Sequence, residues 1–235
     1  MAAKYKTRKE LLKKPDEFIT LTGKAIAFTR DYQNQIFYAL CGIVIVVLIF
    51  LGYRFFAQRA EIKAFSMLQQ TQSEYQAMKA ASSAPEAYSK VAEAFQKIIK
   101  KYGGNAGGKL ARVIFANISY DAGRYDKAIE LYKQSLEDFK DDKAVYNLIL
   151  SSLGYAYEQM DDTQNAVVYF ERAATAEDSL VREEALFNLG WVYQKLGEAA
   201  KSEQTLQTIV DDYPNSIYFD MVQEELSARR RESSS

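Results

Sequence analysis

The stretch from Leu150 to Tyr157, LSSLGYAY, recurs 36 residues later from Leu186 to Tyr193 as LFNLGWVY. Both copies place leucine, leucine, glycine and tyrosine at the same offsets, which puts the four side chains on one face of a helix. Self-similarity at a fixed period of this length is typical of a helical repeat array. Such arrays share a core between stacked helix pairs and leave a concave surface for a partner, so the pattern predicts binding and not chemistry.

Each copy keeps a glycine inside the expected helix, Gly154 and Gly190. Glycine costs about 1 kcal/mol relative to alanine in that position, so its recurrence predicts the close approach of a neighbouring helix. Downstream of the first copy, Ala166 and Phe170 give a small residue and then a large one at a four-residue step. We expect these residues to lie on a second helix that packs back on the first. The glycine-rich run Gly103–Gly108 is expected to be a flexible joint.

These residues resemble the tetratricopeptide repeat (TPR) pattern. The copy from Ala185 to Pro214 matches it closely, and the copy from Leu150 to about Asp178 lacks only the closing proline. An earlier copy runs from Ala111 to Tyr132, with serine at position 119 where tyrosine is expected. A fourth, degenerate unit spans about 61–104. The resemblance implies an all-α fold, a TPR-type α-solenoid of three to four helix pairs.

Composition argues against catalysis. The chain has no histidine, the commonest general base and metal ligand, and its single cysteine, Cys41, leaves no intrachain disulfide. Acid pairs at Asp141–Asp142, Asp161–Asp162 and Asp211–Asp212 fall at expected helix junctions, where acids cap helices. A net charge of −1 gives no case for nucleic acid. We therefore expect no enzyme, no cofactor, no metal site and no small-molecule substrate.

Residues 36–53, IFYALCGIVIVVLIFLGY, form an uncharged run near the N-terminus. Eighteen helical residues span about 27 Å, close to the hydrocarbon thickness of a bilayer. Twelve of them are Ile, Val, Leu or Phe, which favours insertion by about 4–7 kcal/mol. A cleaved signal peptide fits poorly because the run is too long and no Ala-x-Ala site follows. The run predicts a transmembrane signal anchor over 36–57, with a buried core helix as the alternative.

The segments on the two sides of this run differ in charge. Residues 1–35 carry eight basic and four acidic side chains, whereas residues 54–235 carry 22 basic and 27 acidic ones. This asymmetry favours a cytoplasmic tail and an array on the outside. In the tail, residues 15–32 predict a short amphipathic helix, or alternatively a simple approach to the membrane helix. The array is expected over 58–228, followed by a frayed C-terminal tail at 229–235.

The first helix of each pair should line the concave face. Where some TPR proteins clamp a carboxylate with basic side chains, this chain has Val113, Ser151 and Phe187. A mixed aromatic and polar groove is better suited to extended or partly unfolded segments. Tyr155 and Trp191 have an alternative role, since both can pack between repeats. The groove candidates are Asn117, Tyr120, Asp121, Tyr155, Glu158, Gln159, Trp191, Gln194 and Lys195.

One membrane helix, a short basic tail and a TPR array together resemble bacterial inner-membrane TPR proteins, in particular the ancillary subunit of the Sec translocon. The resemblance implies a single-pass protein that contacts the lipid bilayer through 36–57 and carries a periplasmic array. Its implied partners are translocon components, periplasmic chaperones or client polypeptides. The ending Asp211–Ser216 is also similar to that of periplasmic TPR proteins of cell division and outer-membrane assembly. A structural scaffold of such an envelope complex is therefore the alternative function.

Overall fold

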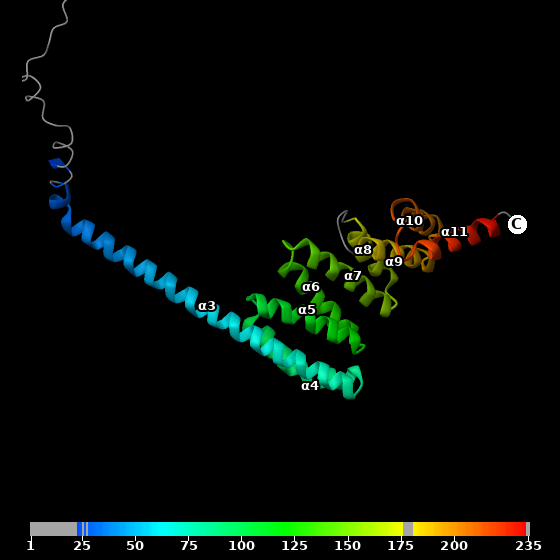
Figure 1. Ribbon diagram of the computed structural model, residues 1–235, viewed down its shortest axis with the longest axis horizontal. Helices are drawn as coiled ribbons and strands as arrows, with labels where there is room; N and C mark the ends of the chain where they lie inside the picture. The colour runs from blue at the N-terminus through cyan, green and yellow to red at the C-terminus, as the bar shows by residue number, and fades with distance from the viewer. Residues whose placement is uncertain (1–22, 25, 27, 176–180, 234–235) are drawn as a thin grey trace, which may run out of the picture. The chain divides into compact units, whose positions relative to one another are not determined.

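The computed structural model describes residues 23, 24, 26, 28–175 and 181–233 and divides the chain into two units, Met1–Arg59 and Ala60–Ser235. Every regular element in these ranges is a helix, which confirms the predicted all-α fold (Figure 1). The amphipathic helix expected at 15–32 falls mostly outside the described residues. The helices are α3 (Gln33–Ala81), α4 (Ala84–Tyr102), α5 (Ala106–Asp121), α6 (Tyr125–Asp138), α7 (Lys143–Gln159), α8 (Thr163–Ala174), α9 (Arg182–Lys195), α10 (Ala199–Asp212) and α11 (Phe219–Ser233).

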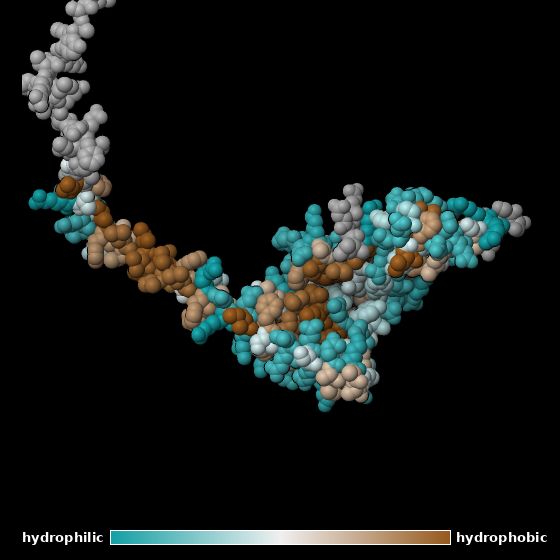
Figure 2. All heavy atoms as spheres, in the orientation of Figure 1, coloured by the Kyte–Doolittle hydropathy of each residue, from teal (hydrophilic) through white to brown (hydrophobic). Residues whose placement is uncertain are grey.

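In the first unit, α3 carries the uncharged run. Figure 2 shows it as a continuous apolar band along the helix. The large apolar side chains from Phe37 to Phe56 are 47–73% exposed. Among the described residues, α3 is the one helix long and apolar enough to cross a membrane, and its apolar window is not buried. The run is therefore not a core helix of this chain, which was the alternative interpretation.

The second unit is an α-solenoid of helix pairs. α5 packs on α6, α7 on α8 and α9 on α10, while α4 packs on α5, α6 on α7, α8 on α9 and α11 on α10. The end of α3, from Ala60, and α4 form the degenerate repeat that was predicted at about 61–104. A two-residue turn joins the two helices. One contiguous hydrophobic core runs through the unit from Ala64 to Leu226. Continuity of the core is expected, because a single helix pair is too small to bury its own apolar face.

The mid-helix glycines mark a close approach of the two helices in two of the pairs. A Cβ on Gly154 would lie 2.6 Å from the Phe170 ring, and one on Gly190 would lie 2.5 Å from the Leu206 side chain. Phe170 and Leu206 have no exposed surface, so neither can move aside cheaply. The predicted close approach of a second helix is confirmed at both positions.

Gly154→Ala is expected to lower the free energy of unfolding by about 1 kcal/mol. Overpacking a filled core costs about 1–3 kcal/mol, and alanine returns about 1 kcal/mol of helix propensity. Thermal unfolding of the detergent-solubilised chain, followed by far-UV circular dichroism, measures the difference. Gly104→Ala, in the turn between α4 and α5, is the control for the steric clash alone, because nothing lies within 4 Å of a Cβ at that position. Equal stability of the two variants would show that the α7–α8 contact is not tight.

The glycine-rich run is only partly the flexible joint expected from its composition. α5 already begins at Ala106, and Gly107 and Gly108 are buried within it. A Cβ on Gly107 would lie 2.9 Å from the Cβ of Ala64, and one on Gly108 would lie 1.9 Å from the carbonyl oxygen of Tyr102. These residues are small because α5 starts against α3 and the end of α4, and not because the chain bends there.

The C-terminal residues also differ from the expectation of a frayed tail over 229–235. α11 continues to Ser233. The Arg229 guanidinium explains this, because it donates hydrogen bonds to Glu225 at 2.8 Å, to Ser202 at 3.0 Å and to Gln194 at 2.8 Å. Contacts to α9 and α10 thus hold the last turns of α11 in the helical state.

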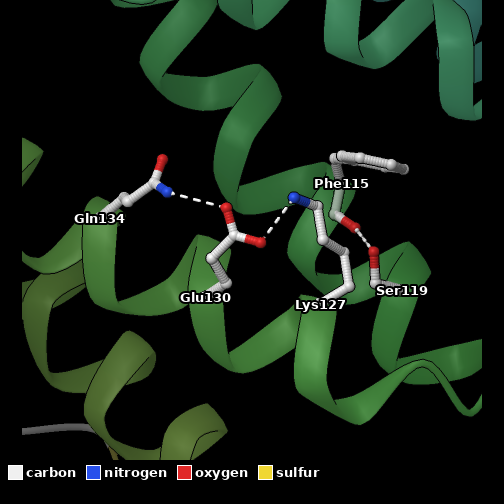
Figure 3. A network of polar contacts seen from close by, with 5 residues as sticks. All are labelled: Phe115, Ser119, Lys127, Glu130 and Gln134. Carbon is white, nitrogen blue, oxygen red and sulfur yellow. Dashed lines mark hydrogen bonds and ion pairs between the residues drawn. The ribbon is translucent and has the colours of Figure 1, made fainter.

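Some polar side chains of α5 and α6 bond within their own helix (Figure 3). Ser119, which stands where the other repeats have tyrosine, is buried and donates to the carbonyl oxygen of Phe115 at 2.6 Å. On α6, Lys127 donates to Glu130 at 2.6 Å and Gln134 donates to the same carboxylate at 3.1 Å. Ser119 is therefore a packing residue, and the Lys127–Gln134 side of α6 is an ordinary solvated surface.

Candidate functional site

Four of the predicted groove residues line a single hollow of about 340 Å³. Asn117, Tyr120 and Asp121 come from α5, and Tyr155 comes from α7. On α5 the three side chains share a face because residues three and four apart are neighbours on a helix. We call this hollow the tyrosine pocket, lined by Asn117, Tyr120, Asp121, Tyr132, Ser152 and Tyr155.

Two lining residues, Tyr132 of α6 and Ser152 of α7, were not among the sequence candidates. Tyr132 lies on a second helix, at the position that Phe170 and Leu206 occupy in the later repeats. The sequence does contain a signal for Tyr132, because it has a hydroxyl where the later repeats have the fully apolar Phe170 and Leu206. Ser152 is three residues before Tyr155, so the α7 helix places both on one face.

Hydrogen bonding fixes part of the pocket and leaves part available. The Tyr132 hydroxyl donates to Asn117 Oδ1 at 2.6 Å, which orients the amide. Among the residues that the structure describes, Asn117 Nδ2 and the Tyr120 hydroxyl make no hydrogen bond. An amide donor beside a phenol can serve a main-chain carbonyl and amide of a bound segment.

Tyr155 has both of the roles that the sequence left open. Its hydroxyl donates to Glu184 at 2.5 Å and accepts from the Asn188 amide at 2.6 Å, so it links α7 to α9. Its ring meets Phe170 edge-on, with 5.2 Å between centroids. The side chain is only half-buried and still lines the tyrosine pocket. It is a packing residue that presents one side to the groove.

The pocket tyrosines are neutral near pH 7. Burial raises the pKa of Tyr120 and Tyr132 above that of a free phenol. Burial, followed by the hydrogen bond to Glu184, raises the pKa of Tyr155. Asp121 forms an ion pair with Lys79 of α3 at 2.6 Å, with both side chains 42% exposed. The pocket therefore offers phenol rings, neutral hydroxyls and one amide, with carboxylate charge at its edge.

Most of the other predicted groove residues serve contacts between helices. Gln159 accepts from Tyr125 of α6 at 3.3 Å, and Lys195 pairs with Asp161. Glu158 lies close enough to Tyr120 to help raise the pKa of its hydroxyl, after burial and Tyr125. The side chains of Gln159 and Lys195 thus connect neighbouring repeats, and their role in a groove stays a prediction.

Trp191 and Gln194 are not part of the tyrosine pocket. Trp191 meets Phe187 edge-on at 5.9 Å between centroids, and the Arg229 guanidinium lies 5.8 Å from its ring. The same arginine donates to Gln194. Contacts from α11 occupy these two residues, so the available part of the groove lies over α5 and α7.

In the described ranges, no three metal-ligating side chains come together. The arrangement is that of a helical-repeat binding scaffold, a class in which the concave face meets a partner. The chain belongs to the tetratricopeptide repeat-like domain family, whose model matches residues 27–180; a tetratricopeptide repeat model matches residues 184–216. Proteins of this fold are typically non-catalytic interaction scaffolds, and no enzyme family is found.

Solved structures confirm the fold. A tetratricopeptide repeat protein from Parabacteroides merdae is 14% identical with a TM-score of 0.56, and the match covers 71% of this chain and 61% of that one. A putative kinesin light chain with TPR-like repeats from Podosopora anserina is 14% identical with a TM-score of 0.54, and the match covers 72% of this chain and 89% of that one. BtubC (BKLC) from P. vanneervenii is 12% identical with a TM-score of 0.53, and the match covers 76% of this chain and 84% of that one. No curated protein matches the sequence. At these identities the likeness extends to the fold alone.

Proposed function

We propose that this protein is a membrane-tethered binding module that holds extended polypeptide segments in the tyrosine pocket. The observation that carries the proposal is the pocket itself, where a half-buried phenol and an oriented amide line one hollow with hydrogen-bonding capacity left over. Aromatic side chains in such hollows often carry most of the binding energy of an interface. Neutral polar groups suit a peptide backbone better than a charged terminus.

The tether is residues 36–57 of α3. Its support is the exposure of the whole apolar run, 47–73% for the large side chains between Phe37 and Phe56. A contiguous apolar surface of this length needs an apolar environment, and a bilayer supplies one. Phe37 and Tyr38 at one end, and Tyr53, Phe55 and Phe56 at the other, are the residues expected at membrane interfaces.

We place the tail of residues 1–35 in the cytoplasm and the array in the periplasm, with the chain in a bacterial inner membrane. The excess of basic residues in the tail supports this orientation. An array tethered in this way would be held close to chains that emerge from the Sec translocon. The proposed partners are therefore translocon components, periplasmic chaperones or client polypeptides.

The alternative function is a structural scaffold of an envelope-assembly or cell-division complex. One observation favours it. Gln159 and Gln194 contact side chains of other helices, and Lys195 pairs with Asp161 in the turn between α7 and α8. Such contacts stiffen a solenoid, and a stiff solenoid suits a fixed assembly as well as a transient binder.

In-cell photocrosslinking tests the proposal. A photoreactive residue at position 158, beside the pocket, should crosslink to translocon components, chaperones or nascent clients. Tyr120→Ala should weaken these crosslinks at least tenfold, because losing a central aromatic costs about 2 kcal/mol or more. Position 134, exposed on the outer side of α6, is the control site.

Two outcomes and one folding control separate the alternatives. Crosslinks of equal strength from positions 134 and 158 would show that the pocket is not the binding site. Crosslinks confined to envelope-assembly or division proteins would reject the secretion role and support the scaffold. An unchanged circular dichroism spectrum for Tyr120→Ala is needed to assign lost crosslinks to binding.

A further inference from the structure

The pocket tyrosines differ from eight other aromatic residues of the array in having no cation over the ring. Elsewhere in the array, a lysine or arginine lies 5.1–5.9 Å from the ring centroid of many aromatic side chains. Among the described residues, no cation lies over the rings of Tyr120, Tyr132 or Tyr155. The rings that carry a cation belong to Tyr75, Tyr102, Tyr146, Tyr157, Tyr169, Tyr193, Tyr213 and Trp191.

Three carboxylates lie at or near the rings of the pocket tyrosines. Asp121 lines the pocket, Glu158 lies near Tyr120, and Glu184 accepts from the Tyr155 hydroxyl. Of the nearby cations, Lys79 is bound to Asp121, and Lys195 is paired with Asp161. Aromatic faces and carboxylates both attract positive charge, and their combination is the usual environment of a bound ammonium or guanidinium group.

Exposed leucines continue the same helix faces. On α7, Leu148 lies four residues before Ser152 and seven before Tyr155, so the three share a face. On α5, Leu110 lies seven residues before Asn117, so these two residues also share a face. Leu148 is 51% exposed and Leu110 is 38% exposed, and Figure 2 shows apolar residues at the surface over this part of the array. The two leucines occupy the same position in successive repeats, one on each helix that supplies the pocket, and we call the pair the leucine strip.

The spacing sets the register of a bound segment. Seven helical residues rise about 10.5 Å, and an extended chain covers that distance in about three residues at 3.3–3.4 Å each. An apolar side chain on the leucine strip would thus stand about three positions away from the side chain in the pocket.

We propose that the tyrosine pocket receives a lysine or arginine side chain of an extended partner segment, with an apolar side chain about three residues away on Leu110 and Leu148. The inference rests on the proposed function, because it names the segment that the pocket binds. It also defines the partner by chemistry, as a basic and apolar stretch of polypeptide and not an acidic C-terminal tail.

Fluorescence polarisation on the full chain in nanodiscs tests this assignment. The probe is a labelled peptide, Ser-Gly-Leu-Ser-Gly-Arg-Ser-Gly, compared with a version in which citrulline replaces arginine. Citrulline keeps the shape and removes the charge. The arginine peptide should bind about tenfold more tightly, which corresponds to the 1–2 kcal/mol of a desolvated cation–π contact. Replacing the leucine of the peptide by serine should weaken binding several-fold.

Variants of the chain assign the effect to the pocket. Tyr120→Leu keeps bulk without the aromatic face and should remove most of the discrimination between arginine and citrulline. Glu158→Gln should reduce it, whereas Glu137→Gln, on the exposed side of α6, should leave it unchanged. Equal affinity for both peptides would overturn the cation assignment but leave segment binding intact. Binding of neither peptide, with the crosslinks from position 158 retained, would overturn the proposed motif and not the proposed function.

Discussion

Asp138→Ala is expected to lower the free energy of unfolding by about 3 kcal/mol, because it breaks a largely buried ion pair. Asp138 of α6 forms an ion pair with Arg112 of α5, and the two side chains are only 17% and 13% exposed. Burial lowers the pKa of Arg112, because desolvation disfavours its charged form. Removing the carboxylate leaves this guanidinium inside the array without its counter-ion.

The control is the preceding residue. Glu137 is exposed on α6, so Glu137→Ala should change stability by less than about 0.5 kcal/mol. Urea denaturation of the detergent-solubilised chain, monitored by circular dichroism, compares the midpoints of the two variants.

A double variant distinguishes two causes of the instability: the lost attraction of the ion pair, and the buried Arg112 charge left without a counter-ion. Leu150 and Leu186 occupy the position of Arg112 in the later repeats and are buried there. Arg112→Leu combined with Asp138→Leu should therefore recover most of the lost stability, since apolar replacements of buried ion pairs are often neutral or better. If the double variant is as unstable as Asp138→Ala, the stranded charge is not the cause.

The repeat architecture was predictable because a helix face is set by periodicity alone. Gly154 and Gly190 recur at the same offset, and the structure gives both the same role, contact with a large buried residue of the second helix. Where composition replaced periodicity as the argument, prediction was wrong. Gly107 and Gly108 look like a joint, yet they are buried where α5 starts against α3 and α4.

The candidate site was predicted only as far as the first helices extend. Asn117, Tyr120 and Tyr155 meet in one hollow because the repeat phase fixes their faces. Tyr132 comes from the second helix of its pair, whereas the predicted groove residues all lie on first helices. Trp191 is occupied by Arg229, 38 residues later, and a contact between helices so far apart in the chain has no signature in a local pattern.

Introducing two arginines into the apolar run, Val44→Arg with Val47→Arg, is expected to release the chain from the membrane. Each arginine near the centre of a membrane helix costs about 2.5–3.5 kcal/mol. Together they cancel the estimated 4–7 kcal/mol that favours insertion of residues 36–53. Both valines are exposed in the structure, at 55% and 47%, so folding of the array does not depend on them.

Carbonate extraction measures the outcome. The wild-type chain and the matched control Val44→Leu with Val47→Leu should stay in the membrane pellet, and the arginine variant should appear in the supernatant. Release of the wild-type chain, or retention of the arginine variant, would contradict the anchor.

Protease added to spheroplasts tests orientation in the same strains. It should digest the wild-type array from about residue 57 onward and spare the tail. The array of the arginine variant, no longer exported, should be protected. Protection of the wild-type array would reverse the proposed topology, and the pocket would then face cytoplasmic partners.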